Sequence, residues 1–180
     1  MKPLMLHHSA DSSPFPQFDK INMSHRNRGF PRSSLGFWCG YGFVIDTDAK
    51  RWQARQPGER GAHTAAVCSD GHCNDVTTGV CIAGDFTTLV PTEAQLSALY
   101  LLWKDLTFPP IMLHKDVKNT ACPGSFDFRA ALQERRLPDL QKDLKLAESA
   151  LFNKLSPTRK RMLLRKISRL KQLLLHPDAV

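Results

Sequence analysis

Two histidines and one cysteine supply the ligand types that a catalytic zinc ion uses. His7 ends a short apolar segment near the N-terminus, His114 follows a second apolar segment, and Cys122 closes the loop after it. Imidazole nitrogen and thiolate sulfur both bind zinc, and three protein ligands leave a fourth position for water, which is the arrangement of catalytic sites. If the three residues converge, the sequence predicts a zinc-dependent hydrolase. Taken singly, each also fits an ordinary surface or core position.

His8 competes with His7 for the first ligand position. The two residues are adjacent, and side chains alternate across a strand, so only one of them can face a given pocket. The preceding apolar residues do not decide between them.

The other cysteines do not form an obvious framework, because the total of five is odd. Cys81 lies in an apolar run and is expected to be a buried small residue. Cys68 and Cys73 flank a short polar loop, where we expect two ordinary thiols. A disulfide in an oxidising compartment and a second metal site that includes His72 are the alternatives.

The composition is that of a globular protein, with 42% hydrophobic residues in 180. We find no apolar run near the roughly 20 residues needed to cross a bilayer. The N-terminal segment, residues 1–7, is too polar and its apolar stretch is too short for a signal peptide. We therefore expect synthesis in the cytoplasm without a signal peptide.

Positive charge is concentrated at the C-terminus. Residues 134–180 hold 12 Lys/Arg and 5 Asp/Glu, whereas residues 1–133 hold 13 and 12. Leucines at helical spacing and the Ser156-Pro157 start signal predict a basic helical hairpin over 134–176. Such a segment favours an anionic membrane or lipopolysaccharide. Nucleic acid is not expected, since aromatic residues for stacking are few. A hairpin that merely packs its leucines against the rest is the alternative.

The preceding part alternates strands and helices. Short strands are expected at 4–7, 41–46, 51–55, 78–86 and 111–113, with the second and third forming a hairpin. A helix is expected over 18–28, and another begins at Thr92, where Gln95 completes a capping box. This order predicts an α/β (α+β) fold with a central mixed sheet flanked by helices. We place the catalytic domain at 1–133 and a basic appendage at 134–180.

Six segments in this order resemble one family. They are Leu6-His7-His8-Ser9-Ala10, Gly40 to Asp46, Gly61-Ala62-His63, Gly79 to Phe86, Pro91 to Gln95, and His114 to Gly124. The sequence over residues 4–128 is similar to the zinc-dependent N-acetylmuramoyl-L-alanine amidases, which include phage lysozyme-type amidases and peptidoglycan recognition proteins. No single segment is specific, but the ordered set is.

The resemblance implies a role for each matching residue. The zinc ligands would be His7, His114 and Cys122, with His7 preferred because it directly follows the apolar strand. Tyr41 would orient water or stabilise the oxyanion, and Thr120 would donate a hydrogen bond where some members carry a lysine.

Three further positions of the resemblance concern the surroundings of the ligands. His63 would contact substrate or support the ligands. Lys118 is a weaker candidate, to compensate for the lysine that Thr120 replaces, and a solvated surface lysine is the alternative. Gly42 stands where the family commonly has a histidine, so no role carries over to that position.

The implied substrate is peptidoglycan, cleaved between N-acetylmuramic acid and L-alanine for cell-wall lysis, as by a phage or prophage endolysin acting in the periplasm or outside the cell. Two alternatives stay open. One is a non-catalytic peptidoglycan-binding module, against which Cys122 argues. The other is a cytoplasmic amidase that recycles soluble muropeptides.

Overall fold

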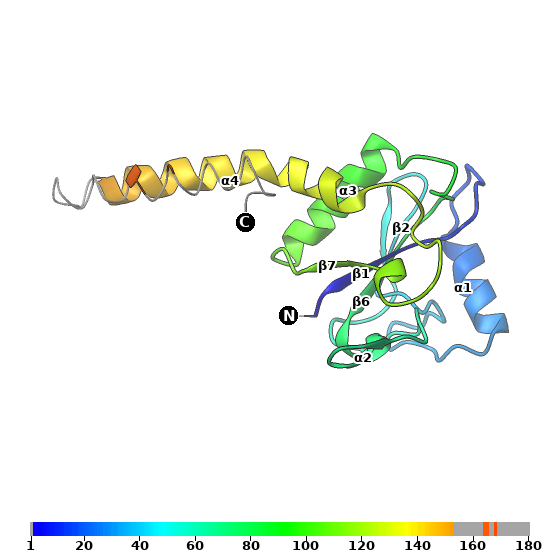
Figure 1. Cartoon of the computed structure of the whole chain (residues 1–180). Coiled ribbons are helices and arrows are strands. Elements are labelled where there is room, and N and C mark those ends of the chain that lie inside the picture. The colour runs from blue at the N-terminus through cyan, green and yellow to red at the C-terminus, as the bar shows by residue number, and fades with distance from the viewer. Residues whose placement is uncertain (1, 153–163, 166–167, 169–180) are drawn as a thin grey trace. The chain divides into compact units, whose positions relative to one another are not determined.

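The computed structural model describes residues 2–152, 164–165 and 168 (Figure 1). The chain divides into two compact units, Met1–Glu134 and Arg135–Val180. The predicted boundary after residue 133 lies inside the long helix α4 (Phe128–Phe152). No described helix is long and apolar enough to span a membrane.

The first unit is built on a five-stranded mixed sheet, as the sequence predicts. Its order is β3-β2-β6-β1-β7, and only the β2–β3 pair is antiparallel. The strands are β1 (Leu4–His8), β2 (Phe43–Ile45), β3 (Arg51–Gln53), β6 (Thr78–Ile82) and β7 (Ile111–Leu113). The interior strand β1, between β6 and β7, has all five residues buried, which is typical of a strand covered on both faces.

Helices cover both faces of this sheet. Leu4 and Leu6 of β1 share a hydrophobic core with Leu99 and Trp103 of α3 (Glu93–Asp105). The opposite face carries a smaller core around Phe18, the first residue of α1 (Phe18–Asn27). The two faces of β1 therefore have different neighbours, and residues of odd number point away from α3.

The predicted helix starts and stops are largely confirmed. Thr92 and Gln95 form the capping box of α3, with each side chain bonded to the other residue's backbone N–H. Helix α1 ends at Asn27, one residue before the predicted end, and Gly29 follows with φ of 73°. A positive φ favours glycine, so this position ends the helix as the sequence indicated.

The strand predicted over 78–86 is shorter, because β6 ends at Ile82. Gly84 adopts φ of 144°, and the N–H of Phe86 then donates to Nδ1 of His8 at 3.2 Å. These features turn the chain out of the sheet, and the apolar residues that suggested a longer strand instead enter the core.

The expectation of two free thiols at Cys68 and Cys73 was wrong, because the structure joins them in a disulfide. A small ribbon, β4 (Val67–Cys68) paired with β5 (Gly71–His72), folds the polar loop back on itself. The short helix α2 (Cys73–Val76) follows directly, so the Cα atoms of the two cysteines come within 5.1 Å.

In the second unit, α4 bears out the predicted helix through residue 152. The second helix of the predicted hairpin lies mainly outside the described residues. Within its range, only residues 164, 165 and 168 are described, and these three are helical.

Candidate metal centre

His7 lies on the interior strand β1. It is next to the last residue of β1, its side chain points to the face away from α3, and it is 1% exposed. His8 points the other way, where its Nδ1 accepts from Phe86 and lies 3.7 Å from an Asp85 carboxylate oxygen. The structure therefore separates the two adjacent histidines, and only His7 faces the other two predicted ligands.

His114 and Cys122 are brought together by one loop. His114 begins a 3-10 turn, η1 (His114–Asp116), directly after β7, which pairs with β1. The N–H of Lys115 donates to the carbonyl of Cys122 at 2.9 Å, which closes the intervening loop. Because β7 lies beside β1, closing this loop delivers both side chains to His7.

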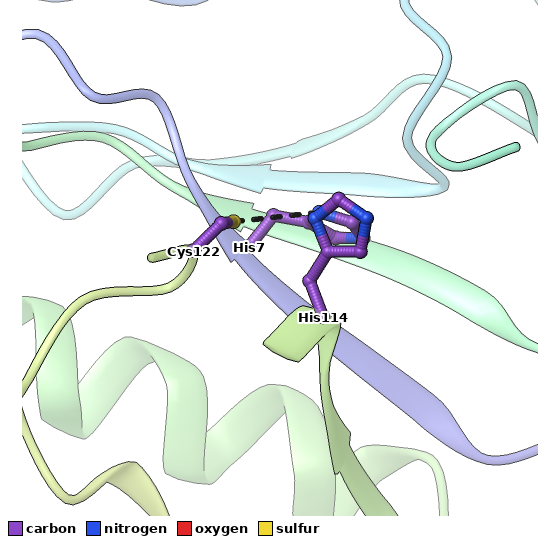
Figure 2. Close-up of side chains that lie close together, drawn as sticks. All are labelled: His7, His114 and Cys122. Carbon is purple, nitrogen blue, oxygen red and sulfur yellow. Dashed lines mark hydrogen bonds between the residues drawn. The ribbon is translucent and has the colours of Figure 1, made fainter. Parts of the chain in front are cut away.

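The three side chains form a group with the dimensions of a metal site (Figure 2). One ligand atom from each lies within 4.8 Å of the others. The Sγ of Cys122 is 3.7 Å from Nδ1 of His7, close to the roughly 3.6 Å that tetrahedral zinc bonds to nitrogen and sulfur require. Among the described residues, these three are the one group of His, Cys and acidic side chains that could hold a metal ion. His72, the residue of the alternative second metal site, is exposed and lies outside this group.

The outer nitrogen of each imidazole is already bonded. Nε2 of His7 lies 3.0 Å from Nδ1 of His63, and Nε2 of His114 lies 3.0 Å from Oγ1 of Thr64. By contrast, Nδ1 of His114 is buried and has no hydrogen-bond partner in the described part of the chain. A buried polar atom without a partner is costly, and a metal ion at the centre of the group would satisfy it.

The hydrogen bonds behind His7 are consistent with a ligand at Nδ1. In that state Nε2 carries the proton and donates to His63, whose own Nε2 faces the hydroxyl of Thr77 at 3.4 Å. Thr77 in turn donates to the carbonyl of Cys73 at 2.6 Å. Each donor thus meets an acceptor, and outer partners of this kind fix the orientation of metal-binding imidazoles.

Burial controls the protonation of the group. The pKa of His7 is well below its ordinary value because the ring is desolvated and because His63, His114 and His8 are close. Burial also lowers the pKa of His114, with a further contribution from the charge of Lys118. The imidazoles are therefore neutral at pH 7, as metal ligands must be. Burial raises the pKa of the Cys122 thiol to about 11, against a lowering by the His8 N–H.

Tyr41 and Thr120 line the same hollow as the three predicted ligands, and this hollow has a volume of about 270 Å³. The centroid of the Tyr41 ring lies 5.1 Å from the centroid of the His7 ring. Burial first, and the Cys81 thiol next, hold the pKa of Tyr41 well above its ordinary value, so its hydroxyl remains a donor. The hydroxyl of Thr120 accepts from the N–H of Cys122 at 3.3 Å, which supports the ligand loop.

The structure also locates residues that sequence reasoning missed. Thr64 and Asn74 support the imidazoles from behind, and His25 lines the hollow with its Nδ1 accepting from the N–H of Gly40 at 2.9 Å. Thr64 directly follows the segment that ends in His63, which is the one signal that pointed to it. Lys118 is exposed and reaches the site only through its charge.

The fold is that of the amidases and peptidoglycan recognition proteins. The N-acetylmuramoyl-L-alanine amidase LysC from Clostridium intestinale URNW is 26% identical with a TM-score of 0.57, over 76% of this chain and 87% of that one. The Ph2119 endolysin from a Thermus scotoductus MAT2119 bacteriophage is 21% identical (TM-score 0.54; 73% and 83%). Drosophila PGRP-LB is 22% identical (TM-score 0.52; 69% and 76%). A search of curated protein sequences gave no match.

The family follows from the sequence match. Residues 1–125 match the model of the N-acetylmuramoyl-L-alanine amidase family, Amidase_2. The chain belongs to this family, and the predicted resemblance, fold and amidase class are confirmed.

Proposed function

We propose that this chain is a zinc-dependent peptidoglycan hydrolase that cleaves the amide between N-acetylmuramic acid and L-alanine and serves in cell-wall lysis. The observation that carries the proposal is the His7–His114–Cys122 group with its buried, unpartnered Nδ1, in a chain of the amidase family. The endolysin role is supported by similarity to a solved structure described as the endolysin amidase LysCS, at 26% identity.

Zinc is the cofactor that suits this ligand set. Two neutral imidazoles and one cysteine match its preference for nitrogen and sulfur. When bound, zinc would polarise the scissile carbonyl and lower the pKa of a water at its open position to about 7.

The chain's own residues supply the remaining steps. Tyr41, kept protonated by burial, is suited to donate a hydrogen bond to the carbonyl oxygen as negative charge develops on it. Thr120 lines the hollow and holds the ligand loop through Cys122. His63 lines the hollow too, but its nitrogens face His7 and Thr77. We therefore propose that the main role of His63 is to orient His7 and that contact with substrate is secondary.

The first competing reading is a module that binds peptidoglycan without cleaving it. The similarity to recognition proteins concerns the fold alone, at 21–24% identity. A binding module has no need for a complete ligand set, whereas this chain has all three ligand types in one group. The second competing reading, a recycling amidase, would have the same centre and differ in substrate.

Product analysis separates these readings. Purified protein is incubated with intact sacculi and with soluble muropeptides, with and without a chelator, and the products are identified by mass spectrometry. We expect free stem peptides from sacculi, lost on chelation and restored by zinc. Cleavage of soluble fragments alone would favour recycling. Binding to sacculi without cleavage by zinc-loaded protein would refute the enzyme proposal.

For residues 134–180 we propose a role in attachment to an anionic membrane or to lipopolysaccharide. The support is the net charge of +7 in this segment, in which α4 exposes Leu146 together with Lys142 and Lys145. The test compares full-length protein with a variant that ends at residue 133, using vesicles with and without anionic lipid. Equal vesicle binding by the two proteins, with poorer solubility of the shorter one, would favour a packing role instead.

A further inference from the structure

One side-chain oxygen stands behind both imidazoles of the metal centre. Oδ1 of Asn74 accepts from the backbone N–H of His63 at 2.9 Å and from that of Thr64 at 3.0 Å. The side chains of these two residues bond to Nε2 of His7 and Nε2 of His114, respectively. The two histidine ligands come from opposite ends of the domain sequence, yet their outer partners share a single support.

Asn74 is itself held firmly. It lies in α2, directly after Cys73, whose sulfur is bonded to Cys68. Its own carbonyl accepts from the N–H of Gly61 at 2.9 Å, so Asn74 grips the segment 61–64 at both of its ends. The support therefore does not depend on a freely moving loop.

The ring of His63 has little room to move away from this arrangement. A Cβ on Gly79 would lie 2.5 Å from Cγ of His63, and a Cβ on Gly61 would lie 2.6 Å from its Cδ2. The two glycines form a slot in which the ring is packed against backbone. A shift of the 63–64 peptide would consequently move the ring against its slot and change the His7 contact.

We propose that Asn74 is a positioning residue for the metal centre, acting through His63 on His7 and through Thr64 on His114. This rests on the proposed zinc site and deepens it. Loss of the Oδ1 acceptor frees two backbone N–H groups together, so both imidazoles lose their orientation in one step. Changes to the outer partners of metal ligands typically cost roughly 10- to 100-fold in metal affinity, and we expect a loss in that range.

The test is a matched set of variants. Asn74→Leu keeps the approximate shape and removes the acceptor, whereas Asn74→Asp keeps an oxygen in the same place. Asn22→Leu is the control, because Oδ1 of Asn22 also accepts from two successive backbone groups, Trp38 N–H at 2.7 Å and Cys39 N–H at 3.0 Å. That pair makes no bond to a metal ligand, so Asn22→Leu reports the general cost of losing such a clamp.

Two measurements are made on each protein without substrate: zinc affinity by competition with a chelating indicator, and the visible spectrum of the cobalt(II)-substituted form, which reports ligand geometry. We expect weaker zinc binding and an altered spectrum for Asn74→Leu, near-normal values for Asn74→Asp, and normal values for Asn22→Leu. If Asn74→Leu does not fold, Asn74→Ser replaces it, since its hydroxyl is one bond too short for the same contact.

The outcomes separate this proposal from the proposed function. If wild-type protein binds no zinc, the metal centre itself is wrong. Normal wild-type binding with unchanged affinity in Asn74→Leu would overturn the positioning role alone, as would equal losses in Asn74→Asp and Asn74→Leu. The loss caused by Asn74→Leu should also shrink in a Thr64→Val background, because one of its two routes is already absent.

Discussion

Zinc affinity should rise about tenfold as the pH is raised from 6 to 7. The reason is the Cys122 thiol, whose pKa burial raises to about 11 in the metal-free protein. The thiol is protonated throughout this range, but zinc binds the thiolate, so binding must release its proton. One proton released per ion gives one tenfold step per pH unit.

The histidines should add little to this slope. The pKa of His7 is well below its ordinary value, and the pKa of His114 is lowered as well, in both cases first by burial. A lowered pKa leaves a larger share of each ring neutral at a given pH than in a free imidazole, so the histidines release fewer protons than the thiol as zinc binds. Water on zinc, with a pKa of about 7, is mostly un-ionised near pH 6 and half ionised at pH 7, so the contribution of the thiol is read most directly at the lower end of this range.

The assay is a competition titration at several pH values, corrected for the indicator's own protonation. Calorimetry in buffers of different ionisation enthalpy counts the released protons independently. Cys122→Ser should bind zinc weakly and lose the slope. The control is Cys39→Ala, since Cys39 is also a buried thiol with a pKa raised to about 11 but lies outside the group. A flat wild-type profile, or an unchanged slope in Cys122→Ser, would refute the reasoning.

Three other outcomes follow from the same geometry. Tyr41→Phe should lower kcat on peptidoglycan by ~10²–10³ with unchanged zinc content; full activity of this variant would exclude the donor role. Gly79→Ala should weaken zinc binding in equilibrium dialysis, because the new methyl group would displace the His63 ring; unchanged affinity would mean that the slot is not needed. Removal of zinc should lower Tm, since saturation at 100 times Kd contributes about 2.7 kcal/mol; identical melting of loaded and stripped protein would contradict a folded-state site.

Local signals in the sequence were reliable where physical chemistry acts locally. The capping box at Thr92 and Gln95 needs only a spacing of three residues, and it was found in place. The end of β6 was missed because the bond between the Phe86 N–H and His8 joins residues 78 positions apart. A local sequence pattern cannot predict a contact between residues so far apart in the chain.

The candidate site divides in the same way. The ligand types of His7, His114 and Cys122 are visible in the sequence, and their order along the chain carries the resemblance to the family. Their supports are not visible, because no sequence pattern distinguishes Thr64 and Asn74 until the fold brings them behind the imidazoles. The Cys68–Cys73 pair was similarly undecidable without the β4–β5 ribbon that aligns it.

The place of β1 in the sheet has a consequence for how the protein can change shape. This strand is hydrogen-bonded on both sides, to β6 and to β7, whereas β3 and β7 form the borders of the sheet. Interior strands exchange their amide hydrogens last, and border segments open first. Of the predicted ligands, His7 therefore lies on one of the segments that open last, whereas His114 and Cys122 lie on the segment that follows β7. Any adjustment to an incoming glycan must come from that segment, because β1 stays in place.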